Sequence, residues 1–193
     1  MNWDNNILNL ANCLKSLSIR NKPGTEIEAD LAFAQLKDLT IRIREAGRTI
    51  YLIGNGASAS MASHVAADLA KNAYIRTEIF TDLSLITAIA NDFSYEDVFA
   101  ELLRRRMTDG DILVAISSSG QSPNVLSASQ VAMLLGGYVV TLSAMRPDNF
   151  LRSKGNLNFY VPAETYGAAE TSHAAILHYW IDTLLVPRIA GRM

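Results

Sequence analysis

The sequence predicts an α/β protein, built as a three-layer α-β-α sandwich around a central parallel sheet of five strands. Short apolar runs alternate with helix-length segments along the chain, and two of these runs, 49–53 and 112–116, are continuously apolar. Continuous apolar runs are typical of parallel strands that are buried on both faces. Strands that alternate with helices predict a parallel sheet with helices on both sides.

The elements follow one another without a low-complexity linker, so residues 1–193 are expected to form a single domain. Segment 1–47 is expected to be helical, with helices over 3–18 and 26–47 and a turn at 21–24. The expected strands are 49–53, 75–80, 112–116, 138–142 and 157–161. The remaining helices are expected over 58–72, 82–90, 96–106, 122–136 and about 167–190, with a polar loop over 145–156.

Both continuously apolar strands run into loops of small and hydroxylated residues that open a helix. The first loop, 54–58, is GNGAS, and the second, 117–122, is SSSGQS followed by Pro123 at the first position of the expected helix. Hydroxyls and free N–H groups at a helix N-terminus favour an anion. Neither loop contains a lysine or the GxGxxG pattern, which argues against a nucleotide P-loop and a dinucleotide site. A sugar phosphate fits best, although such turns also serve simply to connect strands to helices.

Composition excludes several partners. The net charge is −2, so no basic field attracts nucleic acid, and the three arginines at 104–106 are interpreted as a solvated helix face. No stretch has the length or the lack of charge of a transmembrane span, and the N-terminus lacks the basic region of a signal peptide. Cys13 is the single cysteine and cannot form an intrachain disulfide. We therefore expect a cytoplasmic protein with neither nucleic-acid nor membrane partners.

Side chains suited to proton transfer or metal binding sit on two of the expected helices. His64 and Asp68 are four residues apart and share a helix face, so they could bind one metal, form an acid–base pair, or make an ordinary helix hydrogen bond. His173 and His178 lie on the final helix, with Glu170 upstream. Spacing alone leaves these alternatives open.

Three sequence runs resemble those of a known family. They occur in the same order as in the family, and the resemblance covers the whole chain. The runs are 54–59 (GNGASA), 88–93 (AIANDF) and 116–126 (ISSSGQSPNVL). The chain resembles the sugar isomerase (SIS) domain proteins, and more closely the phosphoheptose isomerases. The resemblance implies a flavodoxin-like fold, a homotetramer and active sites shared between subunits. It also implies an aldose–ketose isomerase that converts sedoheptulose 7-phosphate to a heptose 7-phosphate through an enediolate.

The resemblance implies roles for individual residues. Hydroxyls of the second loop take the phosphate, while Asn55 and Ser58 hold sugar hydroxyls. Asn91 and Asp92 are added because two short polar side chains inside an apolar stretch need a reason. The candidate substrate-binding residues are Asn55, Gly56, Ser58, Asn91, Asp92, Ser117, Ser118, Ser119 and Ser122.

The reaction needs a base beside the carbonyl, an acid for the oxygen, and a group that stabilises the enediolate. By resemblance, Asp68 and His178 are the catalytic residues, and zinc is held by His64, Asp68, Glu170 and His178. Oxygen and imidazole ligands suit zinc, which stabilises such an intermediate. His173 inherits no catalytic role and is expected either to pack in the core or to support the site from behind its ligands.

The chain departs from the family at the reacting end. Asp68 replaces a glutamate, Glu170 replaces a glutamine, and Asn72 and Ala168 stand where relatives commonly carry arginines. The shorter Asp68 side chain draws its carboxylate back, and the added negative charge of Glu170 would tighten metal binding while weakening Lewis acidity. Eight residues of straight helix span roughly 12 Å, so Glu170 and His178 can meet at one ion only if Glu170 sits at a bent or looped helix start.

Three functions remain open at this point. The first is the isomerase of a seven-carbon ketose phosphate, and the second is a related isomerase of a different sugar phosphate. The third is a non-catalytic SIS module that senses a sugar phosphate or binds another protein. The presence of His64, Asp68 and His178 together favours catalysis, because a pure interaction module does not need all three.

Overall fold

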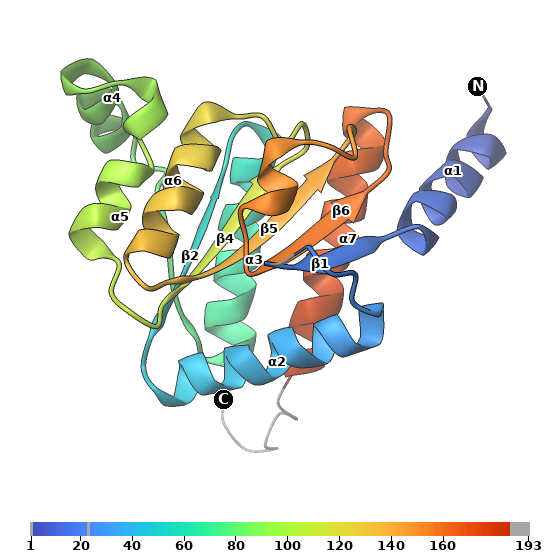
Figure 1. Ribbon diagram of the computed structural model, residues 1–193, viewed down its shortest axis with the longest axis horizontal. Coiled ribbons are helices and arrows are strands. Elements are labelled where there is room, and N and C mark those ends of the chain that lie inside the picture. The colour runs from blue at the N-terminus through green and yellow to red at the C-terminus, as the bar shows by residue number, and fades with distance from the viewer. Residues whose placement is uncertain (1, 23, 186–193) are drawn as a thin grey trace.

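The computed structural model describes residues 2–22 and 24–185, which fold into three layers around one sheet (Figure 1). Within these residues the sheet has six strands in the order β1-β6-β5-β4-β2-β3. They are β1 (Ser18–Asn21), β2 (Thr49–Gly54), β3 (Arg76–Ile79), β4 (Ile112–Ser117), β5 (Tyr138–Ala144) and β6 (Leu157–Val161). Strands β2 to β6 are parallel to one another, and β1 runs antiparallel at the edge beside β6. The predicted α-β-α sandwich is confirmed, and the five predicted strands are the five parallel ones.

The prediction of five strands was wrong by one, because β1 lies where a helix end and a turn were expected. Helix α1 (Trp3–Lys15) ends earlier than predicted, and Ile19 of β1 pairs with Phe159. Ile19 is buried, and the Arg152 guanidinium lies 4.1 Å from the ring centroid of Tyr160, the β6 residue that pairs with Ser18. A four-residue strand carries too little periodicity to be seen in the sequence, and its partners are far along the chain.

Helices cover both faces of the sheet. One face carries α2 (Ala29–Glu45), α3 (Ala57–Ala73) and α7 (Tyr166–Leu184), and the other carries α4 (Leu83–Asp92), α5 (Ala100–Arg106) and α6 (Pro123–Leu134). Two short 3-10 turns, η1 (Tyr95–Asp97) and η2 (Phe150–Ser153), complete the elements in the described residues. The end of the last predicted helix, 186–190, lies outside the described residues.

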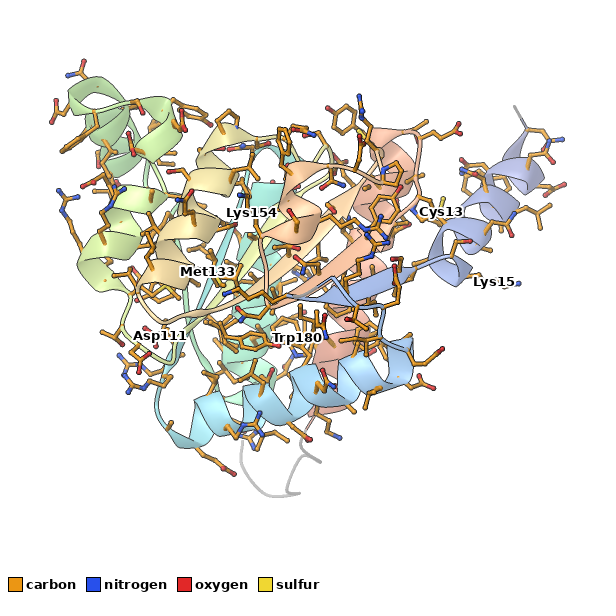
Figure 2. The ribbon with its side chains drawn as sticks, viewed as in Figure 1. Cys13, Lys15, Asp111, Met133, Lys154 and Trp180 are labelled. Carbon is orange, nitrogen blue, oxygen red and sulfur yellow. The ribbon has the colours of Figure 1, made fainter. Side chains whose placement is uncertain are left out.

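The sheet separates two hydrophobic cores. Alternate residues of β2 show this, since Ile50 and Leu52 face the α2, α3 and α7 layer while Tyr51 and Ile53 face the other. Trp180 is buried in the first core, and its Nε1 donates to Thr40 Oγ1 at 3.0 Å, which ties α7 to α2 (Figure 2). Among the described residues, no helix combines the length and the apolarity that crossing a membrane requires.

His173 lies entirely within the core on α7. Its exposure is 0%, and neither ring nitrogen makes a hydrogen bond of ordinary geometry within the described residues. Burial lowers the pKa of His173 from 6.5 to about 4, and the neighbouring Ser143 backbone opposes this shift. The histidine is therefore neutral in the folded protein, which agrees with the packing role predicted for it.

We predict that His173 makes the protein less stable as the pH falls. The unfolded chain binds this proton below pH 6.5 while the folded chain resists it until about pH 4, so stability is lost between these values. The full loss is about 3 kcal/mol. Urea unfolding at pH 7, 5.5 and 4.5 should give a shallower pH dependence for His173→Leu than for the wild type. Parallel curves for the two proteins would show that His173 is not the group responsible.

Candidate active site

The two loops predicted to hold a phosphate lie side by side. Strands β2 and β4 pair in parallel with Gly54 opposite Ile116, so both strands end at the same level of the sheet. The first loop turns sharply, because Gly56 has φ of +55° and a Cβ on Gly54 would lie 2.6 Å from the Ser58 Cβ. The glycines therefore allow α3 to start directly beneath the strand end.

Two asparagines join the loops. Asn55 Nδ2 donates to Asn124 Oδ1 at 2.9 Å, and Asn124 Nδ2 donates back to Asn55 Oδ1 at 3.0 Å. The hydroxyl of Tyr95, on η1, donates to Asn55 Oδ1 at 3.3 Å. Asn55 is thus fixed from two sides at the mouth of the site.

The second loop gathers hydroxyls at the N-terminus of α6. Ser117 Oγ and Ser122 Oγ lie 3.0 Å apart, and Ser119 Oγ accepts from the Gln121 N–H at 3.2 Å. Gly120 has φ of +63°, and a Cβ there would lie 2.0 Å from Asn149 Oδ1. Small side chains are therefore required for this turn, and we call the hydroxyls of Ser117, Ser119 and Ser122 the serine cradle.

Ser118 lies in the same loop as the serine cradle, and its role in substrate binding remains a prediction. Its hydroxyl is buried and unpaired within the described residues, while its carbonyl accepts from the Ala144 N–H at 3.0 Å. The backbone of Ser118 thus extends the pairing of β4 with β5.

Asn91 and Asp92 lie at the exposed C-terminal end of α4 and bond to each other, with Asn91 Nδ2 donating to Asp92 Oδ1 at 3.0 Å. They stand in an apolar stretch of sequence, but the structure leaves both side chains exposed. No hydrogen bond joins them to the serine cradle or to Asn55 in the described part of the chain. Their role in binding remains a prediction.

Helices α3 and α7 bring together three side chains that can transfer protons or bind a metal ion. His64, Asp68 and His178 each offer one ligand atom, and these atoms all lie within 4.8 Å of one another. His64 Nε2 is 3.4 Å from Asp68 Oδ2, and the two histidine ring centroids are 5.2 Å apart. We call these residues the His-Asp-His cluster; Asp68 is half-buried in it and both histidines are exposed.

Three of the predicted zinc ligands come together in the His-Asp-His cluster. Zinc bonds of about 2.0–2.1 Å in tetrahedral geometry place neighbouring donor atoms roughly 3.3 Å apart, close to the separation of His64 and Asp68. Three protein ligands with one open position are typical of catalytic zinc. Asp68 also lies 3.8 Å from Lys71 Nζ and accepts from Asn72 Nδ2 at 3.4 Å, which holds its carboxylate in place.

Glu170 does not join this cluster within the chain. Helix α7 starts at Tyr166, so Glu170 is an ordinary helical residue and not part of a bent or looped start. Its eight-residue spacing from His178 therefore separates the two by roughly 12 Å along the helix axis. The cluster found in the described residues does not include Glu170, whose role as a zinc ligand remains a prediction.

Sequence reasoning missed Asn124 and Tyr95 as site residues. Asn124 is buried directly after the serine cradle, and an amide at the start of a helix beside Pro123 is a recognisable signal. Tyr95 had no such signal, since its contact with Asn55 joins segments 40 residues apart.

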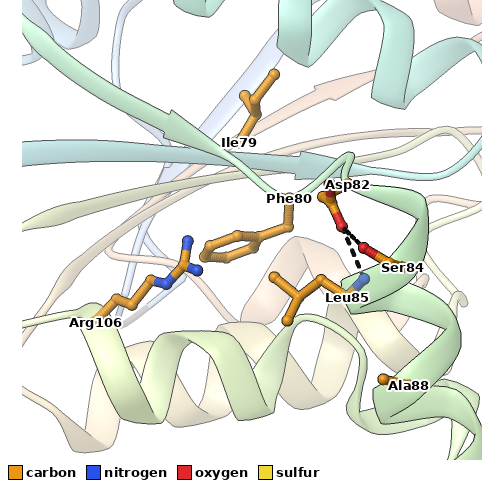
Figure 3. Close-up of a pocket in the computed structure, with 7 residues that line it drawn as sticks. All are labelled: Ile79, Phe80, Asp82, Ser84, Leu85, Ala88 and Arg106. Carbon is orange, nitrogen blue, oxygen red and sulfur yellow. Dashed lines mark hydrogen bonds between the residues drawn. The ribbon is translucent and has the colours of Figure 1, made fainter.

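A cavity lies elsewhere, between the end of β3 and α4 (Figure 3). It encloses about 530 Å³ and is lined mainly by apolar side chains, with Arg106 at one side. The hydrogen bonds that Asp82 accepts from the Ser84 hydroxyl and the Leu85 N–H lower its pKa and cap α4. No residue predicted for the active site lines this cavity.

Comparison with known proteins places the chain in a family. The SIS domain profile matches residues 24–144, well over half of the chain. The phosphoheptose isomerase of Coxiella burnetii (strain Dugway 5J108-111) is 35% identical over 145 residues, which cover 69% of this chain and 73% of that protein. That of Shewanella sp. (strain ANA-3) is 31% identical over 161 residues, covering 79% and 82%.

Solved structures agree with these relatives. Phosphoheptose isomerase from Neisseria gonorrhoeae superposes with a TM-score of 0.73 at 28% identity, covering 79% of this chain and 85% of that one. A phosphoheptose isomerase from Francisella tularensis gives a TM-score of 0.79 at 22% identity, covering 94% and 93%, and supports the fold alone. The chain therefore belongs to the SIS domain family, in which its curated relatives are phosphoheptose isomerases.

Proposed function

We propose that this protein is a phosphoheptose isomerase that interconverts sedoheptulose 7-phosphate and a heptose 7-phosphate through an enediolate. The His-Asp-His cluster is the observation that carries this proposal, because it supplies a carboxylate and two imidazoles from two helices within 4.8 Å. A module that only binds a sugar phosphate needs the serine cradle but not this cluster. The names of its relatives support the same activity.

The serine cradle holds the phosphate in this proposal. Ser117 and Ser122 present two hydroxyls 3.0 Å apart at the N-terminus of α6, where the helix dipole favours negative charge. Asn55 lies beside them and offers its amide to sugar hydroxyls. The phosphate then acts as a handle that positions the reacting carbons for proton transfer.

Asp68 and His178 carry out the proton transfers. Asp68 removes a proton from the carbon next to the carbonyl and returns it to the neighbouring carbon, while His178 moves protons to and from the two oxygens. Lys71 and Asn72 contact the Asp68 carboxylate, at 3.8 and 3.4 Å. Both catalytic groups are thus positioned by side chains of α3 and α7.

His64, Asp68 and His178 would hold a zinc ion, as their spacing and donor atoms suit. Bound zinc supplies a Lewis acid that polarises the carbonyl and stabilises the enediolate charge. A carboxylate bound tightly to zinc is a poorer base, so Asp68 serves one of these roles at a time.

We further propose a homotetramer with active sites at subunit interfaces. Helix α1 projects from the body of the molecule (Figure 1), and its Trp3, Ile7 and Leu8 are 72%, 48% and 60% exposed. Such an apolar helix face is suited to packing against another subunit. The exposed histidines of the His-Asp-His cluster also need a cover, because proton transfer to carbon works best with water excluded.

The activity is tested by incubating the protein with sedoheptulose 7-phosphate and added zinc while following the aldose product by NMR. We expect turnover by the wild type and by Asp38→Asn, which changes an exposed carboxylate on α2. We expect Asp68→Asn to lose about 10²- to 10⁴-fold in turnover, the range for a general base, while binding the sugar phosphate with similar affinity.

Normal turnover by Asp68→Asn would remove this residue from the mechanism. No turnover by the wild type, despite binding of the sugar phosphate, would show that the substrate is a different sugar phosphate or that the protein only binds it.

Tyr95→Phe should weaken substrate binding without unfolding the protein. The Tyr95 hydroxyl holds Asn55 Oδ1, and one such hydrogen bond is worth about 0.5–1.5 kcal/mol, which corresponds to roughly a 2- to 10-fold loss in kcat/KM. In steady-state kinetics we expect KM to rise while kcat stays unchanged. Tyr166→Phe, at a similarly exposed tyrosine at the start of α7, is the matched control. An unchanged kcat/KM in Tyr95→Phe would show that Asn55 does not depend on this contact.

Shared active sites predict that two inactive variants rescue each other. Asp68→Asn lacks the base, and a triple variant with Ser117, Ser119 and Ser122 changed to alanine lacks the serine cradle. If each site takes its base from one subunit and its cradle from another, tetramers refolded from an equal mixture should recover about a quarter of the wild-type activity. If each chain forms its own site, the mixture should recover none, which would contradict a shared site.

A further inference from the structure

A second pocket, lined by polar side chains, lies at the starts of the parallel strands. The loops of the active site lie at the opposite ends of β2 and β4. The pocket encloses about 400 Å³ and is lined by Gly47, Arg48, Thr49, Tyr51, Arg76, Glu78, Arg106, Thr108 and Asp111. Thr49 is the first residue of β2, Arg76 is the first of β3, and Asp111 directly precedes β4. Asp111 appears at this end of the sheet in Figure 2. The pocket is thus formed where three parallel strands begin.

Three guanidinium groups line this pocket, from three different elements of the chain. Arg48 follows α2, Arg76 starts β3 and Arg106 ends α5. Each guanidinium has five N–H donors. In the described structure each makes one hydrogen bond here. Arg48 donates to Thr108 Oγ1 at 3.2 Å, and Arg76 donates to the Gly47 carbonyl at 3.3 Å. Arg106 donates to the Glu78 carboxylate. Most of the donors therefore remain for a ligand.

The two carboxylates in the pocket are already engaged. Glu78 pairs with Arg106. Asp111 is buried and accepts from the Thr49 N–H at 2.9 Å, the Thr108 N–H at 2.8 Å and the Thr108 hydroxyl at 3.0 Å. Neither carboxylate pairs with Arg48 or Arg76, and these two arginines have no carboxylate within ion-pair distance among residues 2–22 and 24–185.

Arg106 is held in place more firmly than the other two. Besides its pairing with Glu78, its guanidinium lies 5.8 Å from the Phe80 ring centroid, as Figure 3 shows from the side of the neighbouring cavity. The Tyr51 hydroxyl also donates to the Arg106 carbonyl at 2.8 Å. Arg48 and Arg76 are therefore the arginines left to bind a ligand, beside a fixed third one.

We propose that this pocket binds a small phosphate-bearing ligand through Arg48 and Arg76. Guanidinium forks match the oxygen geometry of phosphate and form paired, charge-assisted hydrogen bonds with it. A cavity of about 400 Å³ accommodates a ligand larger than inorganic phosphate. The three arginines outnumber the two carboxylates of the pocket, and a bound phosphate would offset the remaining positive charge.

This ligand is distinct from the substrate. Strand β2 has six residues from Thr49 at this pocket to Gly54 at the serine cradle, and a strand of six residues spans roughly 20 Å. One sugar phosphate does not reach both ends. The pocket is a separate site on the same two strands, β2 and β4, that position the catalytic loops.

The test is a calorimetric titration of the full-length protein with sodium pyrophosphate, in metal-free buffer at constant ionic strength. We expect a binding component whose Kd rises at least tenfold in the Arg48→Gln/Arg76→Gln double variant. The matched control is Arg104→Gln/Arg105→Gln, which removes the same charge from arginines paired with Glu101 outside the pocket. This control should bind pyrophosphate like the wild type.

Two further comparisons distinguish binding in this pocket from binding at the serine cradle and from misfolding. Pyrophosphate held by the serine cradle would persist in the Arg48→Gln/Arg76→Gln variant, so only the component lost in that variant belongs to the pocket. The Arg48→Lys/Arg76→Lys variant keeps the charge without the fork and should bind with intermediate affinity, which also guards against a misfolded glutamine variant. The proposal is overturned if the wild type shows no component that the glutamine variant lacks. It is equally overturned if the Arg104→Gln/Arg105→Gln control loses as much binding.

Discussion

The parallel pairing of β2 with β4 is the constraint on which the active site depends. Five consecutive pairs, from Ile50 opposite Ile112 to Gly54 opposite Ile116, bring both strands to an end at the same level. The loops that follow are then close enough for Asn55 and Asn124 to exchange two hydrogen bonds. A register shift of one residue would turn every side chain of β2 to the opposite face and separate the loops.

The pairing of β2 with β4 also determines the other end of the sheet. The carboxylate of Asp111 accepts from the backbone N–H groups of Thr49 and Thr108, which fixes the starts of β2 and β4 together. A buried carboxylate is tolerated there because three donors satisfy it. The strands are therefore anchored at one end by a carboxylate and shaped at the other by glycines, and polar groups gather at both ends.

The chemistry of the site depends on a second contact, between α3 and α7. Both helices bury small residues on their packed faces, among them Ala62 and Ala66 on α3 and Ala169 on α7. Small side chains allow two helices to approach closely. This approach places the rings of His64 and His178 5.2 Å apart although they are 114 residues apart in the sequence. Substituting larger residues on these faces would separate the groups without changing any of them.

The sequence by itself determined the fold class, the five parallel strands and the position of the serine cradle. These features are local, since an apolar run, a glycine-rich turn and a helix start each lie within about ten residues. It also identified His64, Asp68 and His178, although only through a family resemblance, because helix spacing alone allowed an ordinary hydrogen bond. Tertiary structure decided what depends on distant partners: the edge strand β1 against β6 and the contact of Tyr95 with Asn55. It also decided which ligand atoms gather, because Glu170 and His178 are separated by roughly 12 Å along a regular helix and Glu170 lies outside the His-Asp-His cluster.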